Sequence, residues 1–272
     1  MRMLWNAKNG EVSLGNTKMN YVSFGHGDRK LIILPGLSDG LATVKGKALM
    51  LAGPYAPFFH TFTVYMFSRK NEMPDGYTIR DMANDQAKAM ELLGLGKVSV
   101  MGVSQGGMIA QYLAIDHPDV VEKLVLAVTA PRVNDRIRDC VSKWIGLAEQ
   151  GDHKALMIDT AEKSYSAKYL EKCRKLYPII GAIGRPPNYE RFLINARAIL
   201  GFDASNDLNR INCPTLIIGG EEDKIVGVKA SYELKERIIG SELYVYPGLG
   251  HTAYEEASDF NQRVFRFAEA LE

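Results

Sequence analysis

The chain has 272 residues, of which 46% are apolar, so it can bury a substantial core in one large domain or in a domain with an insertion. Its 33 basic and 32 acidic residues leave a net charge of +1, with no basic block or stripe. This balance gives no reason to expect a nucleic-acid partner or an anionic membrane surface.

Strand-like and helix-like segments alternate through the first third of the chain. Residues 20–25 and 30–36 are predicted as adjacent strands separated by a turn at residues 26–29, and residues 61–67 form another β-branched and aromatic run. A helix follows, begun by the T-x-x-D capping box of Thr78 and Asp81. The alternation is typical of an α/β architecture.

Residues 97–118, KVSVMGVSQGGMIAQYLAIDHP, begin as a short apolar strand and end as a helix that Pro118 stops. Another strand is predicted within residues 120–131. Residues 131–210 differ, because strand signals disappear and helical periodicity takes over. One helix is predicted from the amphipathic stripe of Val141, Trp144, Ile145 and Ala148, and two more within residues 166–178 and 188–202.

The α/β alternation resumes after Cys213 and Pro214. Strands are predicted at residues 215–220 and 241–248, and helices at residues 228–238 and 259–271. The simplest organisation is one parallel-rich α/β domain, formed by residues 1–130 and 211–272, with an all-helical insertion of residues 131–210.

Gly102, Ser104 and Gly106 form a G-x-S-x-G motif between the predicted strand and helix. A side chain on so tight a turn needs small residues two positions away on either side. The turn lifts the serine hydroxyl above the carboxyl edge of the sheet and places the Gln105 N–H at a helix N-terminus, which favours developing negative charge. A plain serine helix cap is the alternative, but the strand-turn-helix context favours a nucleophile.

A serine nucleophile needs a base, which a third group orients. Of the five histidines, His251 is different, because it follows the last predicted strand at its carboxyl end, on the sheet edge of Ser104. The other four fit structural or surface positions. For the orienting acid, Glu221, Glu222 and Asp223 follow the strand at residues 215–220, and composition does not choose among them.

The chain resembles an α/β-hydrolase over essentially its whole length, because Ser104, an acid and His251 occur in the order that this family uses. The resemblance implies a mostly parallel central sheet flanked by helices, with an all-helical cap inserted after the sixth strand. In the family's G-x-x-D pattern the matching residues are Gly220 and Asp223, which implies Asp223 as the acid and Glu222 as the fallback.

An oxyanion hole needs two N–H donors. One is expected from Gln105, and the resemblance implies Leu37 as the other, with Ser38 nearby. Leu34-Pro35-Gly36 stands where many relatives carry His-Gly, and residues 67–79 replace an Asp-x-x-Gly-x-Gly-x-Ser segment. These two motifs therefore do not assign the chain to a subfamily. Asp39 and Arg69, which lie in these two regions, are predicted either to line the pocket or to be solvated.

We therefore expect a cofactor-independent serine hydrolase that cleaves a carboxylic ester or lactone through an acyl-enzyme on Ser104. Cleavage of a thioester, an amide or a C–C bond next to a carbonyl is an alternative reaction for the same residues. No metal-ligand or nucleotide-binding motif occurs, so neither a metal nor a cofactor is expected. Two alternatives are an acyltransferase with the same triad and a ligand-binding, receptor-type member of the fold with little turnover.

The insertion is expected to set the specificity for a small-molecule acyl substrate. Candidate substrate-binding residues are Ser38, Trp144, Tyr165 and Phe192, although the aromatic ones are equally suited to holding the cap helices together. The three cysteines form no C-x-x-C and are odd in number, which fits unpaired thiols in a reducing compartment, and the N-terminus becomes polar within a few residues. A cytoplasmic location without membrane partners is therefore expected; the oligomeric state is not predicted.

Overall fold

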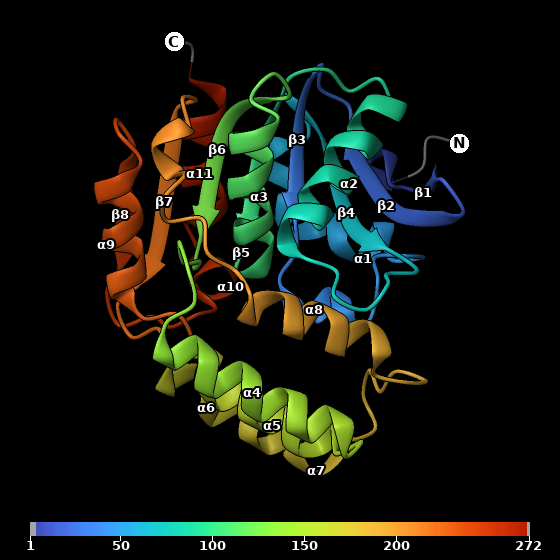
Figure 1. The fold of residues 1–272 in the computed structure, drawn as a ribbon, viewed down its shortest axis with the longest axis vertical. Coiled ribbons are helices and arrows are strands. Elements are labelled where there is room, and N and C mark those ends of the chain that lie inside the picture. The colour runs from blue at the N-terminus through green and yellow to red at the C-terminus, as the bar shows by residue number, and fades with distance from the viewer. Residues whose placement is uncertain (1–3, 271–272) are drawn as a thin grey trace.

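The computed structural model describes residues 4–270, and in these residues eight strands form one sheet with helices on both faces (Figure 1). The sheet order is β1-β2-β4-β3-β5-β6-β7-β8. The strands are β1 (Lys8–Leu14), β2 (Thr17–Gly25), β3 (Arg29–Leu34), β4 (Phe62–Lys70), β5 (Val98–Val103), β6 (Val121–Ala127), β7 (Thr215–Gly220) and β8 (Glu242–Tyr246). Pairing is antiparallel on both sides of β2 and parallel from β4 to β8.

The helices lie on the two faces of the sheet and over its carboxyl edge. They are α1 (Ala48–Ala52), α2 (Ile79–Leu92), α3 (Gln105–Asp116), α4 (Asp135–Glu149), α5 (His153–Ser164), α6 (Ala167–Cys173), α7 (Tyr177–Ile180), α8 (Glu190–Leu200), α9 (Val228–Arg237), α10 (Ala253–Glu256) and α11 (Phe260–Glu269). The capping box of α2 is present as predicted, with Thr78 and Asp81 each accepting from the other's backbone N–H. Leu271, predicted as the end of the last helix, lies outside the described residues.

Two details of the first strands correct the sequence-based prediction. β2 and β3 are consecutive in the chain but not neighbours in the sheet, because β4 lies between them. The reason is tertiary: the turn after β2 is bound by the segment leading into β4, where the His26 N–H donates to the Phe59 carbonyl (2.9 Å). β1 was not predicted, because Val12 is its only buried side chain and the strand lacks an apolar face.

Alternate residues of the central strands pack into two separate cores. On β3, Ile32 and Leu34 join the core beneath α2, α3 and α9, whereas Leu31 and Ile33 join the core beneath α1 and α11. This alternation follows from the two-residue period of a strand that is covered on both faces. The confirmed class is therefore α/β, with a mostly parallel sheet flanked by helices.

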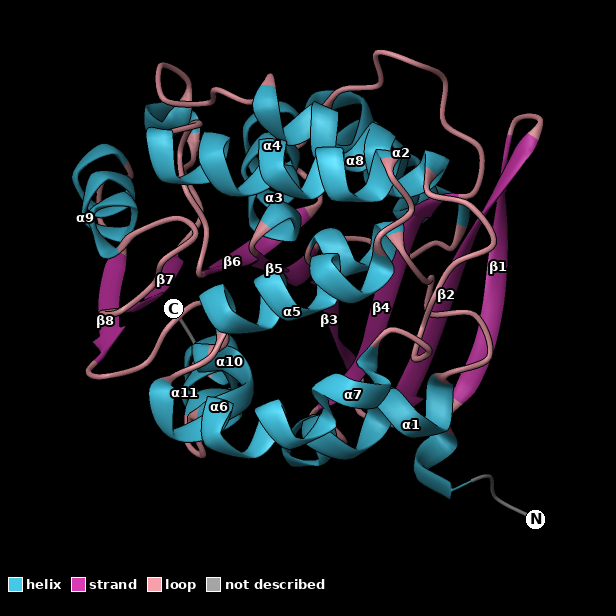
Figure 2. Ribbon diagram, turned by 90° about the horizontal axis from the view of Figure 1, so that it is seen from below, coloured by secondary structure: helices cyan, strands magenta, loops and turns pink. Residues whose placement is uncertain are grey.

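Among the described residues, α4 to α8 occupy the connection between β6 and β7, within the segment whose bounds we propose as 131–210. α5 was not predicted. The carboxyl ends of β3, β6 and β7 point towards these helices, and α8 lies between the sheet edge and α4 (Figures 1 and 2). Within residues 4–270, no helix is both long and apolar enough to cross a bilayer.

Candidate active site

Ser104 lies on the sharp turn between β5 and α3, with φ 53° and ψ −117°. For a residue other than glycine, this backbone conformation is strained. The two motif glycines are there for close packing, because a Cβ at Gly102 would lie 2.3 Å from the Gly106 carbonyl oxygen. A Cβ at Gly106 would lie 1.9 Å from the carbonyl oxygen of Leu34 on β3. The motif therefore allows the turn to close against the neighbouring strand.

Gly106→Ala should lower the free energy of unfolding by about 3 kcal/mol, because the added methyl group meets backbone that cannot rotate away. Urea denaturation of both proteins measures the difference. Gly146→Ala is the matched control: nothing lies within 4 Å of a Cβ added at this helical glycine of α4. We expect the control to be neutral or stabilised by about 0.5–1 kcal/mol. Equal stabilities for the two variants would refute the packing argument.

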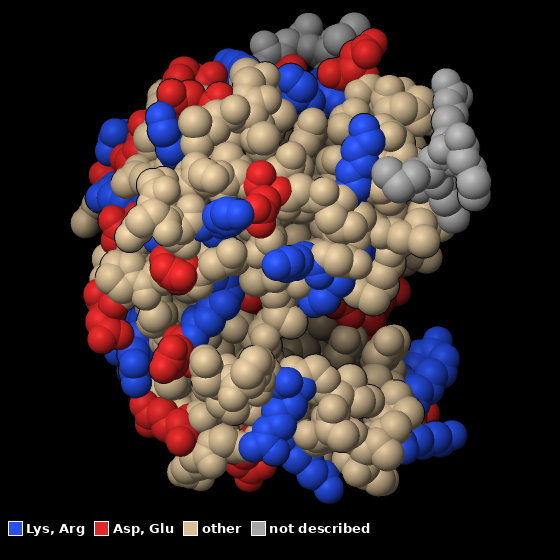
Figure 3. Space-filling view, turned by 90° about the vertical axis from the view of Figure 1, so that its right-hand side faces the viewer, with Lys and Arg blue, Asp and Glu red and all other residues tan. Residues whose placement is uncertain are grey.

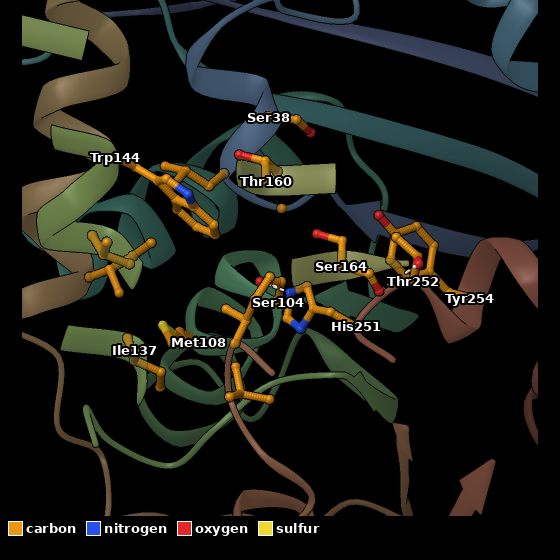
Figure 4. A pocket seen from close by; sticks show the side chains of 16 residues that line it. Ser38, Ser104, Met108, Ile137, Trp144, Thr160, Ser164, His251, Thr252 and Tyr254 are labelled. Carbon is orange, nitrogen blue, oxygen red and sulfur yellow. Dashed lines mark hydrogen bonds between the residues drawn. The ribbon is translucent and has the colours of Figure 1, made fainter. Parts of the chain in front are cut away.

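His251 connects Ser104 to Asp223 by two hydrogen bonds. Its Nε2 lies 2.9 Å from the Ser104 Oγ, and its Nδ1 lies 2.7 Å from Asp223 Oδ2 (Figure 4 shows the Ser104 contact). With the proton on Nδ1, the imidazole donates to the carboxylate and accepts from the serine hydroxyl. The structure thus brings the three predicted residues together in the arrangement of nucleophile, base and orienting acid.

Asp223 is buried, with 4% of its surface exposed. Burial alone raises the pKa of a carboxyl group, but contact with His251 and two backbone amides holds the pKa of Asp223 below its ordinary value. Its Oδ1 accepts from the N–H groups of Ile225 (2.8 Å) and Val226 (2.9 Å). Asp223 is therefore ionised at neutral pH. The fallback acid, Glu222, is exposed.

The two predicted oxyanion donors, Leu37 and Gln105, each stand at the start of a helical turn. Leu37 is the first residue of a short 3₁₀ turn, η2 (Leu37–Gly40), and Gln105 is the first residue of α3, so neither amide has an acceptor within its own helix. A Cβ added to Gly36 would lie 3.5 Å from the Ser104 Cβ, so the two segments meet at the serine.

A cavity of about 110 Å³ opens beside Ser104 and His251. Its apolar lining comes mainly from α3, α4 and α8 and from the loop after Asp223, and Figure 4 shows Trp144 and Met108 facing it. Besides Ser104 and His251, the polar residues of the lining are Ser38, Thr160, Ser164, Thr252 and Tyr254. Among the described residues, the lining contains no Lys, Arg, Asp or Glu.

A family model described as the alpha/beta hydrolase fold matches residues 65–258. The chain belongs to this family. The chain is 27% identical over 249 residues, 88% of the chain and 91% of the relative, to RutD of Caulobacter sp. strain K31, named as a candidate carbamate hydrolase. It is 23% identical to 3-oxoadipate enol-lactonase 2 of Acinetobacter baylyi, with 90% and 91% covered.

The fold of this α/β hydrolase also matches solved structures. MGS-M2, an α/β hydrolase enzyme from a deep-sea metagenome library, aligns with a TM-score of 0.83 at 21% identity, over 97% of this chain and 98% of MGS-M2. Together, the family match and the names of the relatives support hydrolase activity for this chain.

The predicted substrate-binding residues of this α/β hydrolase fall into two groups. Ser38 and Trp144 line the cavity. Tyr165 lies outside the lining, stacked on Tyr169 with its hydroxyl donating to Glu255 (2.7 Å), and Phe192 lies in the buried core. Asp39 and Arg69 do not line this cavity either. They are buried, with 3% and 1% of their surfaces exposed, so they are not solvated loop residues.

Sequence reasoning missed most of the other lining residues of this hydrolase. These are Met108, Ile137, Val141, Thr160, Ser164, Ile199, Ile225, Val226, Thr252 and Tyr254. A sequence signal exists for a few of them: Val141 precedes Trp144 on the apolar stripe of α4, and Thr252 directly follows His251. Residues from α5 and α8 reach the cavity only through tertiary packing.

A second cavity of about 540 Å³ adjoins the first, since both are lined by Gly36, Ser38 and Tyr254. Its walls include Met50, Tyr55 and Met66. Figure 3 shows that one side of the hydrolase is hollowed between its lower part, where α4 to α7 lie in Figure 1, and the part above it. Basic and acidic residues are interspersed on this face, without a large patch of one sign.

Proposed function

We propose that this α/β hydrolase is a cofactor-independent serine hydrolase that cleaves a carboxylic ester or lactone through an acyl-enzyme on Ser104. The observation that carries the proposal is the pair of hydrogen bonds at 2.9 Å and 2.7 Å that join Ser104 to His251 and His251 to Asp223. A serine that serves only as a helix cap needs neither contact. α3 also has no side-chain cap from Ser104.

In the proposed reaction, the Ser104 Oγ attacks the substrate carbonyl carbon while its proton passes to His251 Nε2. The oxyanion that forms accepts hydrogen bonds from the Leu37 and Gln105 amides, and the Asp223 carboxylate stabilises the imidazolium. Collapse of the intermediate expels the alkoxide, which takes the proton from His251. Water then repeats the sequence on the acyl-enzyme, releasing the carboxylic acid and free Ser104.

The cavity linings support a substrate with two unequal parts. The small cavity beside Trp144 and Met108 suits a compact, uncharged group, since burying an unpaired charge there is costly. The larger adjoining cavity provides space for the rest of the molecule. The names of the two curated relatives, a carbamate hydrolase candidate and an enol-lactonase, support a carbonyl group bonded to nitrogen or oxygen.

The test of the proposal is to trap the acyl-enzyme. The protein is mixed with an activated, slowly hydrolysed ester, and the reaction is quenched in acid. After proteolytic digestion, mass spectrometry measures the mass of the peptide that contains Ser104. We expect that peptide to gain the mass of the acyl group. Added alcohol distinguishes a hydrolase from the alternative acyltransferase, because a transferase converts the acyl-enzyme to a new ester in preference to the carboxylic acid. Absence of any acylated peptide and of any turnover would favour the ligand-binding alternative.

A neutral short-chain ester should be hydrolysed with a kcat/KM at least about 10-fold higher than the matched ester whose acyl chain ends in a carboxylate. The reason is that the lining offers no cation to the carboxylate. A carboxylated enol-lactone, such as that of 3-oxoadipate, should be a correspondingly poor substrate. Equal kcat/KM values for the two esters would contradict this choice of substrate class.

A further inference from the structure

The Gln105 side chain is fully buried and hydrogen-bonded at both ends. Its Oε1 accepts from Arg69 Nη2 (2.8 Å), and its Nε2 donates to the Asn195 carbonyl oxygen (2.9 Å). Arg69 lies near the end of β4, and Asn195 lies on the cap helix α8. The side chain of the proposed oxyanion donor Gln105 is therefore bonded both to the sheet, through Arg69, and to α8, through Asn195.

The other side of the oxyanion hole is held by Asp39, in the same 3₁₀ turn as Leu37. Asp39 Oδ2 accepts from the Arg69 backbone N–H (2.9 Å) and from Arg191 Nη2 (2.7 Å). The Arg69 guanidinium also lies 3.8 Å from this oxygen. Arg69 thus contacts the segment of each proposed oxyanion donor, Leu37 through Asp39 and Gln105 directly.

Arg191 extends these contacts to α8. Its guanidinium donates to the backbone carbonyls of Asp39 (3.2 Å) and Arg69 (3.0 Å) and also to that of Lys70. Its own carbonyl accepts from the Asn195 side chain (2.8 Å) one turn later. Through Asn195, the same helix contacts Gln105, so the cap, the β4 end and both oxyanion segments form one connected network.

The network is poorly explained by stability alone. Arg69 and Asp39 are almost completely buried, and a buried ion pair often stabilises a fold no better than apolar residues of the same volume. Among the described residues, Arg69 Nε and Nη1 and Asp39 Oδ1 have no hydrogen-bond partner. Neither residue lines the cavity beside Ser104, so direct contact with substrate there does not explain them.

We propose that Arg69 is a positioning residue of the oxyanion hole, and that Arg191 makes the placement of the hole depend on the cap helix α8. Arg69 fixes the distance between the Leu37 and Gln105 amides by holding Asp39 and the Gln105 side chain together. This role rests on the proposed function, because an oxyanion forms only if Ser104 attacks a carbonyl. Small displacements of such donors are expected to slow the reaction strongly.

The test compares Arg69→Met and Arg191→Met with a matched control, Arg197→Met. Arg197 lies on the same helix but pairs at the surface with Glu149 (2.8 Å). Active sites are titrated to completion with a fluorophosphonate, and kcat and KM per active site are measured for an ester and its thionoester. The thionoester reports on the oxyanion hole, because sulfur accepts weaker hydrogen bonds than oxygen.

For Arg69→Met we expect kcat per active site to fall about 10- to 100-fold on the ester, with little change in KM and a smaller loss on the thionoester. Arg191→Met should show the same pattern at about 3- to 10-fold, and Arg197→Met no change. Gln105→Met keeps the backbone N–H but removes the acceptor of Arg69. It should reproduce the loss, with little further loss when combined with Arg69→Met.

The network would be merely structural if the variants lost titratable active sites but kept kcat per active site. Equal losses of kcat on the ester and the thionoester would show the same. If Arg69→Met does not fold, Arg191→Met and Gln105→Met decide between the same outcomes. The two proposals fail differently. Without an acyl-enzyme in the wild type, the serine hydrolase proposal falls, whereas an active wild type with unchanged variants rejects only the positioning role.

Discussion

Ser104→Ala should lower kcat for a chromogenic short-chain ester by roughly 10⁴- to 10⁶-fold, to the level of the uncatalysed reaction plus any contribution of the oxyanion hole. The variant removes the only atom of the site that forms a bond to the acyl group in the proposed mechanism, while the cavity and the Leu37 and Gln105 amides remain. Initial rates at saturating ester measure the effect, and a fluorophosphonate should label the wild type but not the variant.

The matched control is Ser142→Ala, which removes an exposed serine hydroxyl from α4 and should leave kcat unchanged. His251→Ala should reduce both turnover and fluorophosphonate labelling, because Ser104 then lacks its base. Equal low rates for the wild type and Ser104→Ala would refute the nucleophile. Failure of the reagent to label even the wild type would favour a binding protein of the same fold.

Asp223→Asn should lower kcat by about 10⁴-fold, whereas Glu222→Gln should change it by less than about twofold. The Asp223 carboxylate accepts a hydrogen bond from the protonated Nδ1 of His251 (2.7 Å), whereas an amide at this position favours the wrong tautomer of the imidazole. The Glu222 side chain is exposed. Its backbone N–H donates to the Leu249 carbonyl (2.9 Å), and the substitution leaves this bond in place. Activity lost only in Glu222→Gln would mean that the acid is wrongly assigned.

The same pair of variants should differ in acid stability. Because the pKa of Asp223 is lower in the folded protein than in the unfolded chain, its ionised form stabilises the fold above the unfolded-state pKa of about 3.9. This contribution is lost as the pH falls through the folded-state pKa. The free energy of unfolding should therefore depend less steeply on pH below about 4 in Asp223→Asn than in Glu222→Gln. Parallel curves for the two variants would contradict the lowered pKa.

Features that depend on neighbouring residues were predictable from the sequence. The capping box of α2 and the strand-turn-helix around Ser104 follow from local hydrogen bonding and sterics, and both occur in the structure as expected. His251 follows β8 and Ser104 follows β5, so the rule that parallel strands share a carboxyl edge places both residues on the same edge of the sheet. The family resemblance is confirmed by the match over residues 65–258.

Pairings between distant segments were not predictable in this way. β1 has one buried side chain, so its sequence carries no strand signal. The order of β3 and β4 in the sheet depends on the contact between the turn after β2 and the segment that leads into β4. Gln105 shows the same difference in one residue. Its backbone role follows from its place in the motif, but its side-chain partners lie 36 and 90 residues away and have no local signature.

The sequence by itself determined the class of fold, the turn that carries Ser104 and the order of the three candidate catalytic residues, because each depends on local sterics or on strand direction. Only the tertiary structure decided that Asp223 rather than Glu222 faces His251, that Trp144 lines the cavity while Tyr165 and Phe192 do not, and that Arg69 is buried beside Gln105. Those outcomes depend on how separate segments pack, since burial and long-range contacts are properties of the assembled chain.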